Sequence, residues 1–182
     1  MKFILSIFCL LLFVSSSFAQ QDKTATQNKP DFSGIWLLNF SQSDFGMSKG
    51  HLIYDALTLV ISHQTPELKV TRKWAKKKKE QTRELVYYTD GRGEKNSNFN
   101  KNEIVTSKTN WDGNILTIKG TSSLMILNNV MTSDITEKWE LSADGQTLLQ
   151  IIKTDAPRYA FPGVNLGSVG PRTSRKVFKK SL

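Results

Sequence analysis

Residues 30–36 of the chain read Pro-Asp-Phe-Ser-Gly-Ile-Trp, and they open its first strand-like run. Side chains two residues apart point to the same face of a β-strand. One such face here holds Phe32, Gly34, Trp36, Leu38 and Phe40. A glycine inside a strand lets the strand bend or another group approach closely. The stretch therefore predicts a first strand whose tryptophan ring faces inward beside cleared space.

The same alternation of apolar residues recurs along the whole chain, and no segment shows sustained helical periodicity. Asp112-Gly113 and Ala143-Asp144-Gly145 each separate two such runs, which is typical of β-hairpins. Residues 90–102 and 157–173 read as long loops. Further strands are expected at Ala56–His63, Leu68–Trp74, Gln81–Thr89, Glu103–Trp111, Asn114–Ser122, Val130–Leu141, Thr147–Thr154 and Ser174–Ser181. This pattern predicts an all-β fold, an antiparallel up-and-down β-barrel of about eight or nine strands, with a β-sandwich as the alternative.

The N-terminal segment predicts export. Lys2 precedes an apolar run, Phe3–Val14, and Ser17-Phe18-Ala19 resembles a cleavage site. These features indicate a signal peptide over residues 1–19, cleaved after Ala19. The run is shorter than the roughly 20 residues that span a bilayer, although a membrane anchor remains the alternative. We expect a flexible leader at 20–29, one barrel domain at 30–182, no transmembrane segment in the mature chain, and a secreted or periplasmic location.

Composition excludes several kinds of site. Cys9 is the single cysteine and would leave with the signal peptide, so no disulfide, thiolate nucleophile or cysteine metal site is expected. The two histidines, His51 and His63, lack metal-ligand spacing, and we expect neither a metal nor a cofactor. The net charge is +9, or 9 − 1 = +8 without Lys2. A net positive charge of this size suits an anionic partner. Nucleic acid is not expected as that partner, because the protein is predicted to be exported.

The order and spacing of several short motifs resemble those of small exported bacterial lipocalin-like (calycin-like) proteins. The motifs are Asp31–Trp36, Ser43–Phe45, Leu57–Leu59, Trp111–Gly113, Thr136–Trp139 and Leu141–Gly145. Gly-x-Trp on a first strand is part of the lipocalin signature. The resemblance implies that Trp36, beside Gly34, plugs the closed end of a barrel. It also implies that a basic residue of the last strand, Arg175 or Lys176, packs across the ring.

Polar residues on inward-facing positions are the candidates for ligand binding. Arg72 lies between Val70 and Trp74, and Glu137 lies between Ile135 and Trp139. A buried charge is costly unless it is paired. Arg72 and Glu137 could therefore pair with each other, or Arg72 could receive a ligand carboxylate. The cavity candidates are Leu59, His63, Arg72, Trp74, Tyr88 and Glu137, with His63 next to a turn and so near the rim.

Two other regions offer alternatives. Lys76, Lys77, Lys78 and Lys79 lie where two strands must turn, and they could bind an anionic lipid or glycan surface or simply be a solvated tip. The connection Ser41–Asp55 carries Phe45 and Tyr54, so it either covers the barrel's open end or packs on its exterior.

The leading functional prediction is a binding protein that holds a small apolar or amphipathic molecule in the barrel. The first alternative is a surface-binding module that uses the four lysines. The second is a β-barrel hydrolase or isomerase with His63 as base and Glu137 as acid. No catalytic signature is present, so the sequence favours a protein that is not an enzyme, and no residue is assigned as catalytic.

Overall fold

A computed structural model describes residues 29–46, 54–126, 129–159 and 170–181. Secondary structure within these ranges consists of strands. The strands are β1 (Gly34–Leu38), β2 (Ala56–Gln64), β3 (Glu67–Lys76), β4 (Lys79–Tyr88), β5 (Glu94–Ser97), β6 (Glu103–Asp112), β7 (Ile115–Ile126), β8 (Asn129–Leu141), β9 (Thr147–Thr154), β10 (Arg158–Tyr159) and β11 (Arg172–Lys180). The expected signal peptide and all but the last residue of the expected leader lie outside the described residues. No helix in the described ranges is long and apolar enough to cross a membrane.

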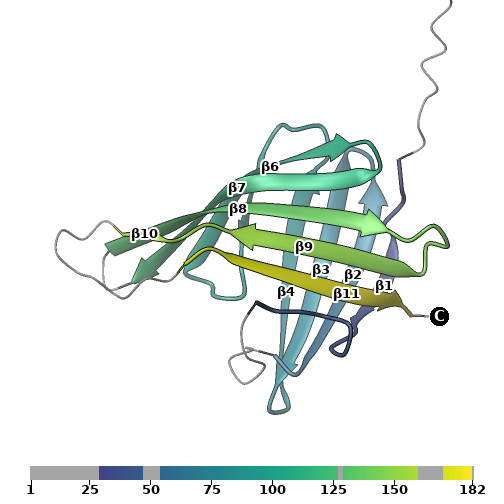
Figure 1. Cartoon of the computed structure of the whole chain (residues 1–182), viewed down its shortest axis with the longest axis horizontal. Coiled ribbons are helices and arrows are strands. Elements are labelled where there is room, and N and C mark those ends of the chain that lie inside the picture. Colours follow the sequence, from purple (N-terminus) through teal and green to yellow (C-terminus); the bar gives the residue numbers. More distant parts are fainter. Residues whose placement is uncertain (1–28, 47–53, 127–128, 160–169, 182) are drawn as a thin grey trace, which may run out of the picture.

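The strands form an antiparallel barrel, as predicted (Figure 1). Their order around the wall is β4-β3-β2-β1-β11-β9-β8-β7-β6-β5, while short β10 pairs with β8 outside this path. Each neighbouring pair in the wall is antiparallel, and β1 joins β11 through Trp36↔Lys180 and Leu38↔Phe178. The wall therefore contains ten strands rather than the eight or nine expected.

β5, the additional strand of the wall, and β10, which lies outside it, both fall in segments that the sequence predicts as loops. β5 falls inside residues 90–102 and β10 inside residues 157–173. The sequence of β5, Glu-Lys-Asn-Ser, has no apolar alternation. It is held instead by Glu94, whose buried carboxylate accepts hydrogen bonds from Ser107 Oγ at 2.6 Å and Thr109 Oγ1 at 2.8 Å. Polar contacts thus keep this strand against β6.

Side chains close the seam between the two end strands, β4 and β5, which share no backbone ladder. The Asn96 side-chain amide takes the place of a strand partner: its Nδ2 donates to the Val86 carbonyl at 2.8 Å and its Oδ1 accepts from the Val86 N–H at 2.9 Å. Glu94 Oε2 accepts from the Tyr88 N–H at 3.2 Å, and Arg83 donates to the Asn98 carbonyl. These contacts satisfy backbone groups that an open sheet edge would expose.

One end of the barrel is filled by aromatic rings. Phe32 and Trp36 are fully buried, and the Trp36 Nε1 donates to the Phe32 carbonyl at 2.9 Å. The Phe32 ring stacks on Trp111 and meets Trp139 edge-on, with centroid distances of 5.8 and 5.9 Å. Trp36 therefore lies at a closed, packed end, as the lipocalin-like resemblance implied.

A basic residue of the last strand does lie over Trp36, but it is Lys180 rather than Arg175 or Lys176. The Lys180 Nζ is 5.4 Å from the ring centroid, a cation–π distance. Gly34 has a φ of +139°, and a Cβ there would lie 2.8 Å from the Lys180 Cε. Glycine is needed here because few other residues adopt this φ. The exposed Arg175 side chain instead donates to the Gln42 carbonyl at 2.9 Å.

Candidate functional site

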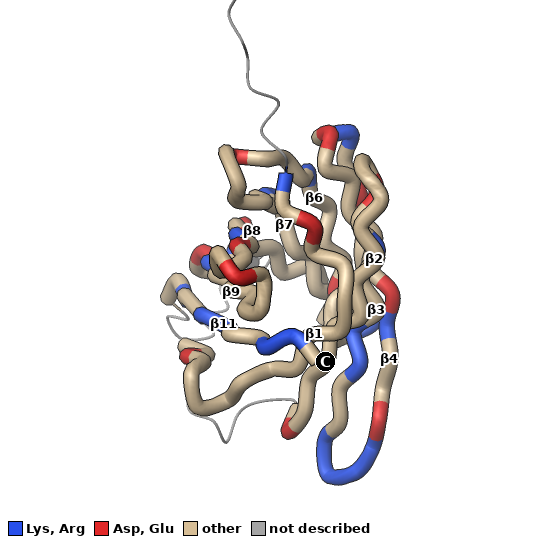
Figure 2. The backbone as a smooth tube through the Cα atoms, turned by 90° about the vertical axis from the view of Figure 1, so that its right-hand side faces the viewer, with Lys and Arg blue, Asp and Glu red and all other residues tan. Residues whose placement is uncertain are grey.

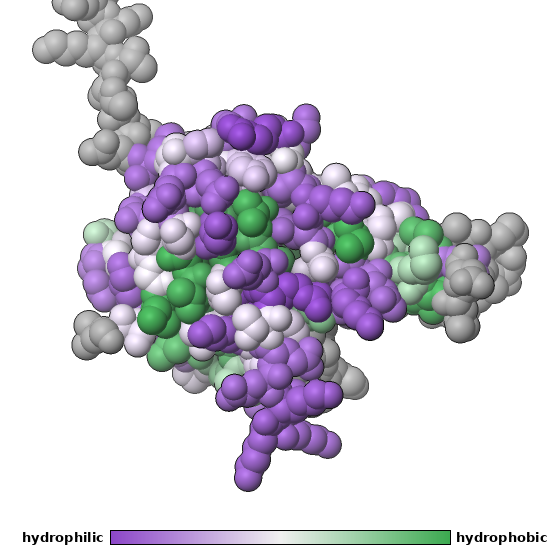
Figure 3. All heavy atoms as spheres, turned by 180° about the vertical axis from the view of Figure 1, so that it is seen from behind, coloured by the Kyte–Doolittle hydropathy of each residue, from purple (hydrophilic) through white to green (hydrophobic). Residues whose placement is uncertain are grey.

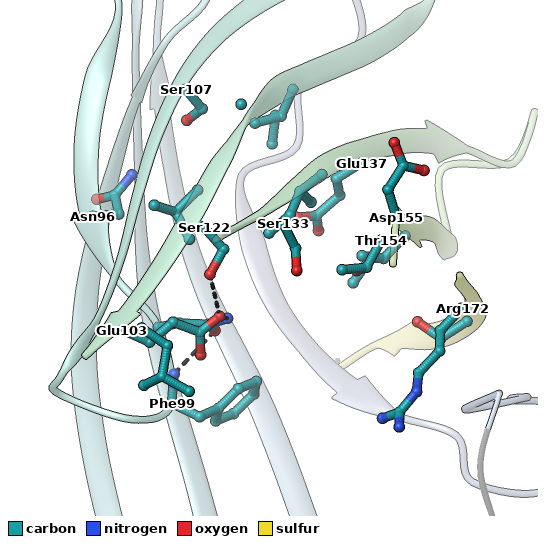
Figure 4. Close-up of a pocket in the computed structure, with 18 of the residues that line it drawn as sticks. Asn96, Phe99, Glu103, Ser107, Ser122, Ser133, Glu137, Thr154, Asp155 and Arg172 are labelled. Atoms are coloured by element: carbon teal, nitrogen blue, oxygen red, sulfur yellow. Dashed lines mark hydrogen bonds between the residues drawn. The ribbon is translucent and has the colours of Figure 1, made fainter. Parts of the chain in front are cut away.

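A cavity of about 440 Å³ occupies the half of the barrel away from this closed end. Strands from both sides of the wall contribute to it, and Figure 4 shows their side chains facing one another across the space. Its aliphatic and aromatic lining includes Leu85, Tyr87, Phe99, Val105, Ile118, Leu124, Met131, Ile135 and Ile152. Its polar lining includes Arg72, Asn96, Asn98, Glu103, Ser107, Ser122, Ser133, Glu137, Thr154, Asp155, Arg172, Ser174 and Lys176.

Strand alternation and small residues create this space. On β8 the lining positions are Met131, Ser133, Ile135 and Glu137, which are successive inward residues. Serines stand at inward positions where larger residues would fill the barrel, and Ser107, Ser122 and Ser133 are all buried. Gly120 also lines the cavity, and it lets β7 approach β6 closely, since a Cβ there would come within 2.3 Å of the Thr106 carbonyl oxygen. The cavity therefore follows from the choice of small residues on inward positions.

Two cations meet at one aromatic ring in the cavity. The Arg72 guanidinium carbon lies 4.4 Å from the Phe99 ring centroid, and the Lys176 Nζ lies 5.8 Å from it. Arg72 NH1 also donates to Asn98 Oδ1 at 3.1 Å. Burial, and then the charge of Arg72, lower the Lys176 pKa to about 8, while Glu137 partly opposes this shift. At neutral pH the Lys176 side chain is therefore still protonated.

The carboxylates of the cavity interior are engaged elsewhere. Glu137, which is 8% exposed, accepts a hydrogen bond from Trp139 Nε1 at 2.6 Å. Glu103 Oε1 accepts from Ser122 Oγ at 2.6 Å and from Asn98 Nδ2 at 3.0 Å, contacts that lie at one side of the cavity in Figure 4. Within the described ranges no ion pair joins Arg72 to Glu137, although both line the same cavity.

Tyr87 and Tyr54 are kept neutral near the cations. Burial, followed by the charge of Glu137, raises the pKa of Tyr87 well above its ordinary value. Burial also raises the pKa of Tyr54 to about 12. Tyr54 packs on Phe99 with a centroid distance of 5.3 Å and on Phe45 at 6.3 Å. The β1–β2 connection thus packs the Tyr54 ring against the cavity-lining Phe99, and the buried Phe45 ring packs behind it on Tyr54.

The structure brings Arg72 and Glu137 into the cavity and places the other four sequence candidates elsewhere. Leu59 is buried in the packed core, and Trp74 lies behind Phe99, with ring centroids 5.2 Å apart. Tyr88 is on the opposite face of β4 from Tyr87, with Arg92 4.9 Å from its ring centroid. His63 belongs to the closed end.

His63 contacts the aromatic rings there and cannot act together with Glu137. Its ring centroid is 6.0 Å from those of both Phe32 and Trp111. Its Nε2 is buried without a hydrogen-bond partner in the described chain. Burial lowers the pKa of His63, and the charge of Asp31 partly offsets this. Phe32 contacts both His63 and Trp139, so these rings separate the proposed base from the proposed acid.

Several cavity residues were missed from the sequence. Phe99 and Glu103 lie in or next to the segment that the sequence predicts as a polar loop, and the lipocalin-like resemblance predicts Lys176 only as a partner of Trp36. A usable signal was the recurrence of serine at inward positions, at Ser107, Ser122 and Ser133. A cluster of three or more histidine, cysteine or acidic side chains suited to a metal does not occur in the described ranges.

Comparisons with known proteins find similar structures but no family. A scan against family models and a search of curated proteins give no match. One similar solved structure is a mutant of the REP1-NXSQ fatty acid transporter, with a TM-score of 0.49 and 12% identity over 83% of this chain and 98% of that one. Another is a "secretary abundant heat soluble (SAHS) protein" from Ramazzottius varieornatus, with a TM-score of 0.48 and 14% identity over 82% of this chain and 94% of that one. Membership of the exported bacterial lipocalin-like family stays a prediction.

Proposed function

We propose that the barrel binds one small amphipathic molecule with an anionic group, of the carboxylate class. The observation that carries this is the meeting of Arg72 and Lys176 at the Phe99 ring, while Glu103 and Glu137 are hydrogen-bonded to other groups. The cations would receive the anionic group, since hydrogen bonds between charged partners are roughly twice as strong as neutral ones. The apolar part of the ligand would lie against the aliphatic lining.

The size and lining of the cavity agree with this proposal. Its volume of about 440 Å³ lies within the roughly 300–1,000 Å³ of small-molecule sites. Such sites combine an apolar wall with a few polar groups that orient the ligand. Here Ile118, Ile135 and Ile152 supply apolar surface, and Ser122 and Ser133 supply hydroxyls.

From the predicted signal peptide we infer that this binding takes place outside the cytoplasm. A secreted or periplasmic barrel would capture or carry its ligand in that compartment. Sequencing the N-terminus of protein recovered after export tests this part, because it should begin at Gln20.

Displacement of anilinonaphthalene sulfonate, a fluorescent amphipathic anion, tests the cavity proposal. Decanoate and decanol have the same alkyl chain and differ in charge. Comparing their affinities therefore separates the contribution of the two cations from that of the apolar wall. Arg72→Gln and Lys176→Gln are expected to weaken decanoate binding about tenfold or more, with little change for decanol. Lys179→Gln is the matched control because Lys179 is exposed on the same strand and bonds Thr147.

Equal weakening of both compounds would contradict a role for the two cations. If neither decanoate nor decanol displaces the probe, cavity binding itself is contradicted. Native mass spectrometry of the exported protein, followed by organic extraction, would then identify any ligand that was already bound.

A further inference from the structure

Two hairpin tips of opposite character project from the same end of the barrel. Strands β3 and β7 run in the same direction because five strands lie between them in an antiparallel wall. The last residues of β3 and of β7 therefore lie at one end, opposite the start of β1 and its Trp36. Figure 1 shows the β3–β4 hairpin pointing down and the β7–β8 hairpin pointing left.

The first of these is an apolar tip made of Met125, Ile126 and Val130. Their exposed fractions are 58%, 42% and 39%, which is high for large apolar side chains. Figure 3, which is seen from behind, shows hydrophobic atoms toward its right-hand side, the side that lies at the left in Figure 1. The next residues toward the barrel, Leu124 and Met131, pair with each other and line the cavity. The apolar tip is therefore continuous with the cavity mouth.

A cation accompanies the apolar tip. The Met125 N–H donates to the Asn102 carbonyl at 3.3 Å, which ties the β5–β6 turn to this hairpin. The exposed Lys101 precedes Asn102 in that turn. Apolar side chains flanked by lysine are the combination that interfacial membrane-binding segments use.

The second is a lysine tip made of Lys76, Lys77, Lys78 and Lys79, visible as a blue turn in Figure 2. Lys77 and Lys78 have φ values of 46° and 67°. Two-residue hairpin turns of this kind favour Asn-Gly, because positive φ strains other residues. Asp55 pairs with Lys76 at 3.2 Å, and Glu80 follows the turn, so four lysines face two carboxylates. The turn keeps its positive charge at a conformational cost.

We propose that this end of the barrel docks on the surface of an anionic lipid bilayer. The apolar tip would enter the headgroup region, and Lys77, Lys78 and Lys79 would lie on lipid phosphates. Charge complementarity selects this occupant, since the chain carries a net charge of +9 and each lysine near an anionic surface contributes attraction. Docking turns the cavity mouth toward the lipid. It goes beyond the proposed function and needs no cavity ligand.

Cosedimentation of the exported, processed protein with vesicles tests the docking. Vesicles of phosphatidylcholine alone are compared with vesicles containing 30% phosphatidylglycerol, about the share that gives a strongly negative surface. Lys77→Asn with Lys78→Gly removes two charges and also relieves the strain of positive φ in the turn. Because the variant should be at least as stable as the unaltered protein, lost binding cannot be assigned to unfolding. It is expected to weaken partitioning to anionic vesicles roughly 25-fold at low salt, about fivefold for each lysine.

The apolar tip is tested with Met125→Ser and Ile126→Ser together. This variant is expected to weaken partitioning about tenfold or more, because it removes apolar surface from the interface. The matched control is Lys108→Gln with Lys119→Gln. These two lysines pair across β6 and β7 on the barrel wall. Their removal lowers the net charge by the same two units away from both tips, and it should leave most of the binding.

Three results would overturn the proposal. The first is no binding to anionic vesicles by the unaltered protein, including the case in which it binds a sulfated glycan instead. The second is an equal loss in the wall control, which would mean that net charge alone drives binding. The third is unchanged binding in the Met125→Ser, Ile126→Ser variant, which would exclude insertion of the apolar tip.

Discussion

Lys176 extends from β11 into the cavity, near Arg72 and the Phe99 ring, and burial lowers its pKa from 10.5 to about 8. In the unfolded chain this lysine keeps its proton up to about pH 10.5, whereas in the barrel it loses the proton at lower pH. Between pH 8 and 10.5 the unfolded state therefore binds more protons. The contribution of Lys176 to the free energy of unfolding rises with pH across this window.

Lys176→Met is expected to remove that rise. Below pH 8 the variant should be more stable than the unaltered protein by about 2–3 kcal/mol, because no buried ammonium must be desolvated. The advantage should shrink as the pH approaches 10.5. Urea denaturation at pH 7, 8, 9 and 10 measures it. A constant difference between the two proteins would show that Lys176 does not titrate in this window.

At the residue scale, alternation predicted Arg72 and Glu137 because each stands between apolar residues on a clear inward face. It assigned Tyr88 to the wrong side of β4, since Leu85–Tyr88 is a continuous apolar run in which either parity can point inward. Alternation also does not predict how far along the barrel axis an inward residue lies. His63 has inward parity but lies at the closed end, and Phe99 covers Trp74 from the cavity.

At the element scale, the seam between β4 and β5 depends on one side-chain amide. Asn96→Ala removes both hydrogen bonds to Val86, and it is expected to lower the free energy of unfolding by about 1–3 kcal/mol. Amide exchange at Val86 should accelerate more than exchange at the centre of β7. Gln81→Ala, an exposed amide removed from the same strand, is the control. Unchanged exchange at Val86 would mean that the seam is held without Asn96.

The β3–β4 turn gives a prediction of opposite sign. Lys77→Asn with Lys78→Gly should raise the free energy of unfolding by about 1–3 kcal/mol, because both positions have positive φ. The midpoint of urea denaturation should rise without a change in its slope. An unchanged or lower midpoint would show that the two lysines carry no conformational strain in this turn.

The elements that sequence predicted best are hairpins with explicit turn chemistry. The Asp112-Gly113 turn separates β6 from β7, and Asp144-Gly145 separates β8 from β9, as expected. β5 was missed because its contacts are made by Glu94 and Asn96 rather than by alternating apolar side chains. A polar strand of this kind is recognisable only when its partners in space are known.

At the scale of the whole molecule, the cavity is a part of the barrel interior that side chains do not fill. Ser133→Leu should preserve or raise stability, by up to about 2 kcal/mol, because the added side chain buries apolar surface. It should also abolish displacement of anilinonaphthalene sulfonate by decanoate. Thr136→Leu places the same side chain on the other face of β8 and should leave binding intact. Normal binding by Ser133→Leu would locate the ligand elsewhere.

The barrel could be predicted from the number of hairpins, and inward serines hint at open space, but the size and lining of the cavity could not be predicted. An inward serine in a sequence is compatible with a void, with a hydrogen bond to a neighbour, or with a larger residue opposite. Ser122 shows two of these at once, since it bonds Glu103 and lines the cavity. The balance between filled and open space depends on residues from strands far apart in the chain.

The sheet order has one further consequence, for chain connectivity. Cutting between β4 and β5 and joining the end of β11 to the start of β1 would give the order β5, β6, β7, β8, β9, β11, β1, β2, β3, β4 along the wall. Every wall strand would then follow its spatial neighbour, and the new ends would fall at a seam that has no backbone ladder to break. The pairing of Trp36 with Lys180 would become local in sequence. In such a circular permutant the contacts of β1 with β11 become local while those of β4 with β5 and β6 become distant, so the contact order and the folding rate should change little.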